Sequence, residues 1–160
     1  MTCFQFEQDF VNSLRCIPMR VRYNLDACSV KLSLQQWQQL TLQQRQGLLE
    51  LPCETAIEQA NYRQQLQQWL LARTGAEAPT LAADKRTAWA IAAVPDTIPE
   101  SVQTQIMAAG ATLSLTQWQN LTALQRFVLI KLSQPGHEHR NFLPALQEFG
   151  LVENSYTSET

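Results

Sequence analysis

The feature that most constrains the fold of this chain is a repeat within its own sequence. Residues 33–51, SLQQWQQLTLQQRQGLLEL, and residues 114–132, SLTQWQNLTALQRFVLIKL, are identical at more than half of their aligned positions. The alignment pairs Trp37 with Trp118 and extends both upstream and downstream. Agreement of this length indicates an internal duplication, and the long period suits two copies of a helical subdomain rather than a solenoid.

Each copy carries the start and stop signals of short helices. Pro18 and Pro99 suit the first turn of a helix, where a missing N–H costs nothing. Gly110 is a plausible left-handed stop. Four capping boxes place Gln three residues after a hydroxyl side chain, and each cap contributes about 1 kcal/mol; they begin at Ser33, Thr41, Ser114 and Thr122. Strand-like alternation is nearly absent, so we expect an all-α fold with helices near 18–28, 34–40, 42–51, 56–73, 99–109 and 142–149.

The repeat also predicts the domain organisation. We expect an N-terminal aromatic segment at 1–17, a first helical repeat at 18–74, a linker at 75–98, a second helical repeat at 99–151 and a disordered tail at 152–160. Each half is too small to bury its apolar stripe alone. The two copies are therefore expected to pack around one core, about a pseudo-two-fold axis.

One helical face differs between the copies. The second copy has three apolar residues on this face, namely Leu124, Phe127 and Val128. The aligned residues of the first copy are Gln43, Gln46 and Gly47. We expect the second helix to lie in the core, whereas the first is exposed on this face or meets a polar partner there.

The N-terminal segment is a second candidate for partner binding. Phe4, Phe6 and Phe10 form a terminal aromatic strip of a kind that docks in a groove. Glu7 and Asp9 lie between them and are expected to form a solvated edge.

The repeated tryptophans and arginines have two interpretations each. We expect Trp37 and Trp118 to be core residues, because a tryptophan at this spacing buries its large area; the alternative is a stacking surface for a flat ligand. Arg45 and Arg126 suit structural arginines bound to helix-end carbonyls or a carboxylate, with an anion site as the alternative.

The cysteines and histidines raise the question of a metal. Cys16, Cys28 and Cys53 lie in the first copy only, and buried thiols are the expected state. The alternative is a carrier of a metal, a cluster or sulfur. His137 and His139 follow Pro-Gly in a loop and do not complete a metal site with one carboxylate.

Composition narrows the function classes. The net charge is −2, and only 16% of residues are charged, which argues against binding nucleic acid or an anionic membrane. The N-terminus lacks the pattern of a signal peptide, and no apolar run approaches a membrane span, so we expect a cytoplasmic protein. Without a nucleophile–base pair or a phosphate-binding loop, we expect neither an enzyme nor a bound cofactor.

The chain resembles the nitrate reductase-associated protein family of cyanobacteria and some other bacteria. The most distinctive matching stretch is FQFEQDFVNSLRCIPMRVRYNLDACSVKLSLQQW at 4–37, and a second is LQRFVLIKLSQPGHEHRNFLPALQEFGL at 124–151. Ser29 and Asn24 depart from the Gly and Lys usual in the family. The serine puts a left-handed helix stop in doubt in the first copy.

The resemblance implies an accessory role. Such proteins tend to be encoded near nitrate reductase and molybdopterin-cofactor genes, and they are thought to support formation of active assimilatory nitrate reductase. The resemblance supplies no catalytic residue. It therefore implies nitrate reductase as a partner, bound through helical surfaces, with a cysteine-based carrier in enzyme or cofactor assembly as the alternative.

Overall fold

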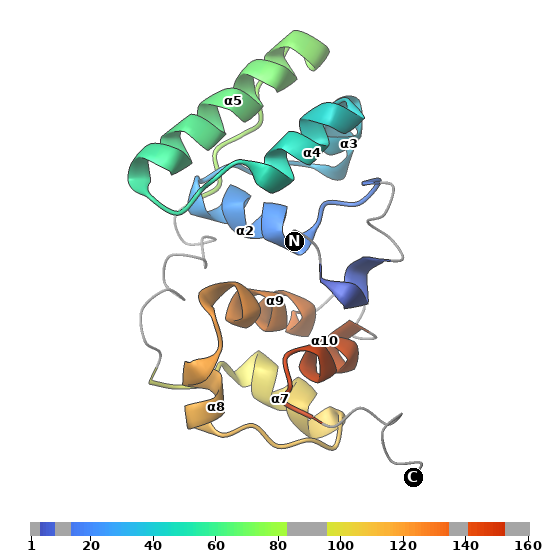
Figure 1. Cartoon of the computed structure of the whole chain (residues 1–160), viewed down its shortest axis with the longest axis vertical. Coiled ribbons are helices and arrows are strands. Elements are labelled where there is room, and N and C mark those ends of the chain that lie inside the picture. Colours follow the sequence, from blue (N-terminus) through green and yellow to red (C-terminus); the bar gives the residue numbers. More distant parts are fainter. Residues whose placement is uncertain (1–3, 9–13, 83–95, 135–140, 153–160) are drawn as a thin grey trace. The chain divides into compact units, whose positions relative to one another are not determined.

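A computed structural model describes residues 4–8, 14–82, 96–134 and 141–152 of the chain. Within these ranges the protein forms eight α-helices and one 3-10 turn without any strand, so the predicted all-α fold is confirmed there (Figure 1). The chain divides into two compact units, Met1–Ala90 and Ile91–Thr160, which we call unit 1 and unit 2. In the described part of the chain, every helix is too short or too polar to cross a membrane.

Some predictions lie outside the described residues. They concern Phe10, Asp9, His137, His139 and the tail beyond Val152.

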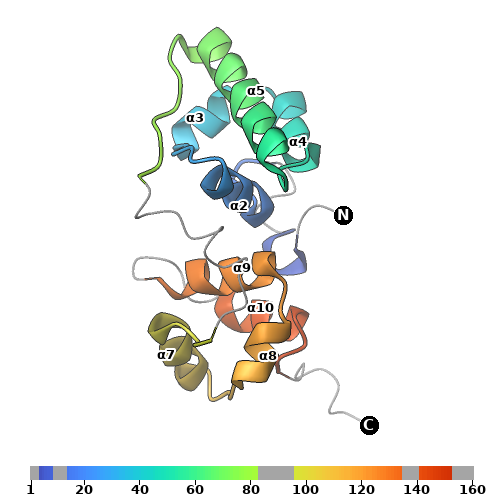
Figure 2. The same ribbon diagram turned by 90° about the vertical axis from the view of Figure 1, so that its left-hand side faces the viewer.

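Unit 1 is built around its longest helix. The elements are η1 (Gln5–Glu7), α2 (Met19–Ala27), α3 (Leu34–Gln39), α4 (Leu42–Glu50) and α5 (Ala56–Thr74). Helix α5 packs against α2, α3 and α4 (Figures 1 and 2). Its buried stripe contains Tyr62, Leu66 and Leu70, and burying such a side chain stabilises the fold by about 2 kcal/mol. The Tyr62 hydroxyl donates to the Leu48 carbonyl at 2.8 Å.

Unit 2 is centred on α9. Its helices are α7 (Glu100–Ala108), α8 (Leu115–Asn120), α9 (Ala123–Ser133) and α10 (Phe142–Glu148). Helix α9 contacts both α7 and α10. Phe127 and Val128 on α9 are fully buried, as the sequence comparison predicts, whereas Leu124 is half-buried. The aligned residues Gln43 and Gln46 on α4 are exposed.

The helix starts follow the predicted capping boxes. At Ser33, the hydroxyl accepts from the Gln36 N–H at 3.1 Å, and the Gln36 side chain accepts from the Ser33 N–H at 3.1 Å. The same reciprocal pairs form at the other three predicted starts, Thr41, Ser114 and Thr122. Thr55 and Glu58 form a further box at the start of α5, which the sequence analysis overlooked although its spacing is the same.

The ends of α2 and α7 are also alike. Gly110 has the expected left-handed conformation, with φ of 69°, and Ser29 adopts it too, with φ of 63°. The doubt over a left-handed stop at Ser29 is therefore wrong. The Val30 N–H donates to the Leu25 carbonyl at 2.9 Å, and the aligned bond from the Ala111 N–H measures 3.0 Å. The same backbone hydrogen bond therefore forms whether the left-handed residue is serine or glycine.

The first part of the predicted linker returns to unit 1. Val30 and Thr80 form an isolated antiparallel bridge. The Lys31 N–H donates to the Pro79 carbonyl at 2.9 Å, and the Leu81 N–H donates to the Ser29 carbonyl at 2.8 Å. Residues 78–81 therefore lie as a short extended segment beside the chain that follows α2.

Candidate docking surface

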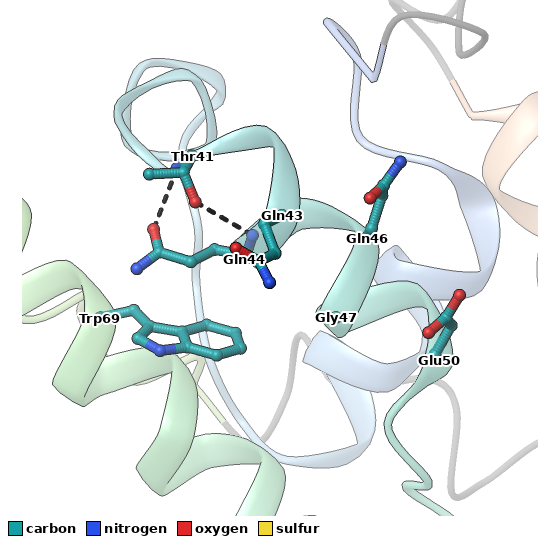
Figure 3. Close-up of a pocket in the computed structure, with 7 residues that line it drawn as sticks. All are labelled: Thr41, Gln43, Gln44, Gln46, Gly47, Glu50 and Trp69. Atoms are coloured by element: carbon teal, nitrogen blue, oxygen red, sulfur yellow. Dashed lines mark hydrogen bonds between the residues drawn. The ribbon is translucent and has the colours of Figure 1, made fainter.

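The exposed face of α4 lines a surface pocket, which we call the α4 pocket (Figure 3). Its volume is about 770 Å³, and it is lined by Thr41, Gln43, Gln44, Gln46, Gly47, Glu50 and Trp69. Three of these, Gln43, Gln46 and Gly47, are the α4 residues that the repeat comparison predicts as a partner-binding face. The structure thus brings the predicted residues together in one pocket.

Helix geometry and one glycine explain the shape of the pocket. Gln43, Gln46 and Glu50 recur at helical spacing and share one face of α4. Helix α5 brings Trp69 to the other side, and its indole lies beside α4 in Figure 3. A Cβ atom at Gly47 would lie 3.1 Å from the ring atom Cη2 of Trp69. The glycine therefore allows the indole to approach the helix backbone closely.

The lining is polar and carries little charge. The Gln44 side-chain oxygen accepts from the Thr41 N–H at 2.9 Å, and the exposed amides of Gln43 and Gln46 offer further donors and acceptors. Glu50 supplies the only carboxylate of the lining. An indole surrounded by amides suits a protein interface, where tryptophan is enriched and charge is depleted. The lining contains no nucleophile paired with a base.

The N-terminal aromatic strip is partly brought together. The rings of Phe4 and Phe6 stack, with centroids 5.5 Å apart and an interplanar angle of 15°. Both side chains are half-buried. Two of the three predicted aromatic residues therefore form one small surface cluster.

Glu7 is not part of a solvated edge, so that expectation is wrong. Its side chain is fully buried, and its carboxylate accepts from the Met19 N–H at 3.0 Å and from the Phe4 N–H at 3.1 Å. Helix α2 begins after Pro18, which offers no side-chain cap. A carboxylate satisfies the exposed N–H groups and the positive end of the helix dipole. Glu7 thus fastens the aromatic strip to α2.

Trp37 and Arg45 have structural roles, as predicted. Trp37 is fully buried, and its indole N–H donates to the Leu14 carbonyl at 2.8 Å. The Arg45 guanidinium donates to the carbonyls of Leu14, Trp37 and Gln38 at 3.2, 3.1 and 2.7 Å. Trp37 is therefore not a stacking surface, and the donors of Arg45 are engaged by two carbonyls of α3 and by that of Leu14.

Trp118 and Arg126 repeat this arrangement in unit 2. Both side chains are buried. The Arg126 guanidinium donates to the carbonyl of Gln119 at 3.4 Å and to that of Leu121. The core role of both tryptophans and the structural role of both arginines are thus confirmed.

The structure brings two of the three candidate cysteines together. Cys28 and Cys53 are buried, and their thiols donate to the carbonyls of Leu25 and Asn24 at 3.6 Å each. A hydrogen bond with the Cys28 side chain, together with burial, raises the pKa of the Cys53 thiol. Cys16 is half-buried, and no three His, Cys, Asp or Glu residues gather as a metal site in the described ranges.

A comparison with known protein families identifies the family of the chain. Residues 3–149 match the family model described as conserved nitrate reductase-associated protein. The chain belongs to this family. The match covers nearly the whole chain and confirms the resemblance seen in the sequence. No curated protein and no solved structure shows a significant similarity to it.

Sequence reasoning overlooked Trp69 as a surface residue. Its side chain is half-buried and lines the α4 pocket. The signal was the glycine at position 47, where the second copy has Val128. A loss of side-chain volume at a matched helical position indicates that a neighbour approaches there.

Proposed function

We propose that this protein is an accessory or maturation factor that supports assimilatory nitrate reductase by binding the enzyme or its apo-form. Membership of the nitrate reductase-associated family over residues 3–149 carries the proposal. In this proposal the protein acts in the cytoplasm by association, without catalysis and without a cofactor of its own.

The α4 pocket is the first contact surface that we propose for the reductase. Its exposed amides match the backbone and polar side chains of another protein, and the partly exposed indole of Trp69 supplies an anchor. The stacked pair of Phe4 and Phe6 is the second proposed contact, since Glu7 holds it against α2.

We also propose that the two units descend from an internal duplication. Helices α2 and α7 both have nine residues, and α3 and α8 both have six. The capping boxes that start α3 and α4 recur at α8 and α9. On this proposal, α9 kept an apolar face at Phe127 and Val128, whereas α4 gained an exposed face suited to a partner.

A native pull-down tests the association. The tagged protein is isolated from its own cells growing on nitrate, and bound proteins are identified by mass spectrometry. We expect nitrate reductase among them, and a tag alone serves as the control. Recovery of the protein without any reductase would contradict stable binding.

The proximity of Cys28 and Cys53 motivates one alternative function, a carrier of metal, cluster or sulfur in enzyme or cofactor assembly. Thiolates are the ligands and nucleophiles in such chemistry. The raised pKa of Cys53 disfavours its thiolate form and so weighs against this alternative. Single Cys→Ala variants at positions 16, 28 and 53 distinguish the two proposals. Full restoration of reductase activity in a deletion strain by folded variants excludes the carrier, whereas its loss excludes a purely adhesive role.

A further inference from the structure

Unit 2 has a second surface pocket beside the chain that follows α7, which we call the α7 groove. Its volume is about 280 Å³, and it is lined by Ile98, three residues of α7 (Gln103, Ile106 and Met107) and residues 111–113. The lining contains no charged side chain. Met107 is 72% exposed, so one large apolar side chain of the lining is open to solvent.

The corresponding backbone edge in unit 1 is covered. Residues 78–81 run antiparallel to the chain that follows α2. Two backbone bonds join the segments, from the Lys31 N–H to the Pro79 carbonyl and from the Leu81 N–H to the Ser29 carbonyl.

Two side chains of α5 hold the covering segment in unit 1. The Gln67 amide donates to the Ala78 carbonyl at 2.9 Å and accepts from the Ala78 N–H at 2.8 Å. Arg63 donates to the Thr80 hydroxyl at 3.1 Å and to the Cys28 carbonyl at 3.2 Å. The extended segment is therefore an integral part of unit 1.

The same backbone edge is open in unit 2. Gly110 and Thr112 align with Ser29 and Lys31. Within the described ranges, the Thr112 N–H and the Gly110 carbonyl form no hydrogen bond. In unit 1, residues 76–82 return to the backbone edge after the 19-residue helix α5. Helix α10 of unit 2 has only 7 residues, so it is too short to support a return of the same kind.

We propose that the α7 groove binds an extended peptide segment of a partner protein, which pairs with residues 110–112 as residues 79–81 pair with residues 29–31. A carbonyl of the peptide accepts from the Thr112 N–H, and the N–H two residues later donates to the Gly110 carbonyl. Strand addition of this kind draws its affinity from main-chain bonds, and adjacent pockets select side chains. The uncharged lining selects small or apolar side chains, as in APTL at 78–81.

The covered edge in unit 1 supplies a probe for the open edge in unit 2. We would titrate the full chain, labelled with ¹⁵N, with the capped peptide AEAPTLA, the sequence of residues 76–82. We expect saturable shifts of the Ala111 and Thr112 amide resonances, with a dissociation constant of about 1 mM. A peptide with an N-methyl group on its leucine lacks the donor for Gly110, and we expect at least about fivefold weaker binding.

A matched pair of variants tests the groove itself. Met107→Lys places a charge on the apolar wall, so we expect about tenfold weaker binding. Ile57→Lys is the control, because Ile57 is 74% exposed and belongs to unit 1; its binding should equal that of the wild type. The exposure of both positions means that neither change disturbs the core.

Three results would overturn the proposal. The first is the absence of saturable binding below about 10 mM, a concentration that corresponds to negligible affinity. The second is binding that neither the N-methyl group nor Met107→Lys weakens. The third is dimerisation that Met107→Lys abolishes, since that result assigns the groove to a second copy of the chain. The test requires no reductase, so its outcome is independent of the proposed function.

Discussion

Two aligned residues, Ser29 and Gly110, show how one backbone position accepts different side chains. Each lies two residues after the last residue of a nine-residue helix, and both have positive φ. The left-handed region costs a residue with a Cβ about 1–2 kcal/mol, whereas glycine enters it freely. The remaining bonds of the stop hold Ser29 in place despite this cost.

This difference gives a prediction for stability. Ser29→Gly should raise the free energy of unfolding by about 1 kcal/mol, because it removes the left-handed strain. The reciprocal change, Gly110→Ser, should lower it by a similar amount. Urea denaturation followed by circular dichroism measures both. A Ser29→Gly protein less stable than wild type would show that the serine side chain contributes more than the strain costs.

Glu7 carries a second prediction at the residue scale. Glu7→Ala leaves the Met19 and Phe4 N–H groups without their carboxylate acceptor, so the free energy of unfolding should fall by about 3 kcal/mol. Glu7→Gln retains one acceptor oxygen and should cost less. Gln8→Ala at the exposed neighbouring position is the control for thermal denaturation. A Glu7→Ala protein as stable as the control would mean that the N-terminal turn does not hold α2.

At the scale of elements, unit 1 depends on a segment that no local sequence pattern marks as structured. Residues 78–81 look like a linker, with a proline and small side chains. They are ordered by contacts with residues that lie far away in sequence, Gln67 on α5 and the chain at 29–31. Buried backbone groups need such partners.

Gln67 should therefore matter more than other glutamines of α5. Gln67→Ala removes two bonds to the Ala78 backbone, one as donor and one as acceptor, and should destabilise the protein by about 2 kcal/mol. The exposed Gln68→Ala should change the stability by less than about 0.5 kcal/mol. Hydrogen exchange at Lys31 and Leu81 should accelerate in the Gln67 variant only. Unchanged exchange would show that the segment is held without Gln67.

The elements also show what could be predicted from the sequence. The capping boxes and the glycine stop at Gly110 depend on residues within one turn of each other, so local patterns predict them. The roles of Glu7 and Trp69 depend on the packing of distant segments. Glu7 was misplaced because its amphipathic surroundings suggested a surface, although Pro18 left α2 without a local cap.

At the scale of the whole molecule, the two units contain corresponding helices but expose different surfaces. Unit 1 covers the edge after α2 and exposes the polar face of α4, whereas unit 2 buries the aligned face of α9 and leaves the edge after α7 open. The difference between the faces of α4 and α9 was predicted from the sequence, because it lies in aligned side chains. The difference between the two backbone edges depends on the lengths of α5 and α10, which a comparison of aligned side chains does not reveal.

The most direct test of the account is the affinity of purified nitrate reductase for the purified protein, measured by biolayer interferometry. We expect the wild type to bind and the Gln43→Glu/Gln46→Glu double variant to bind at least about tenfold more weakly, since two carboxylates enter the neutral centre of the interface. Gln64→Glu/Gln68→Glu, at exposed positions of α5, should retain the wild-type affinity. A reductase that does not bind the wild-type protein would contradict the account.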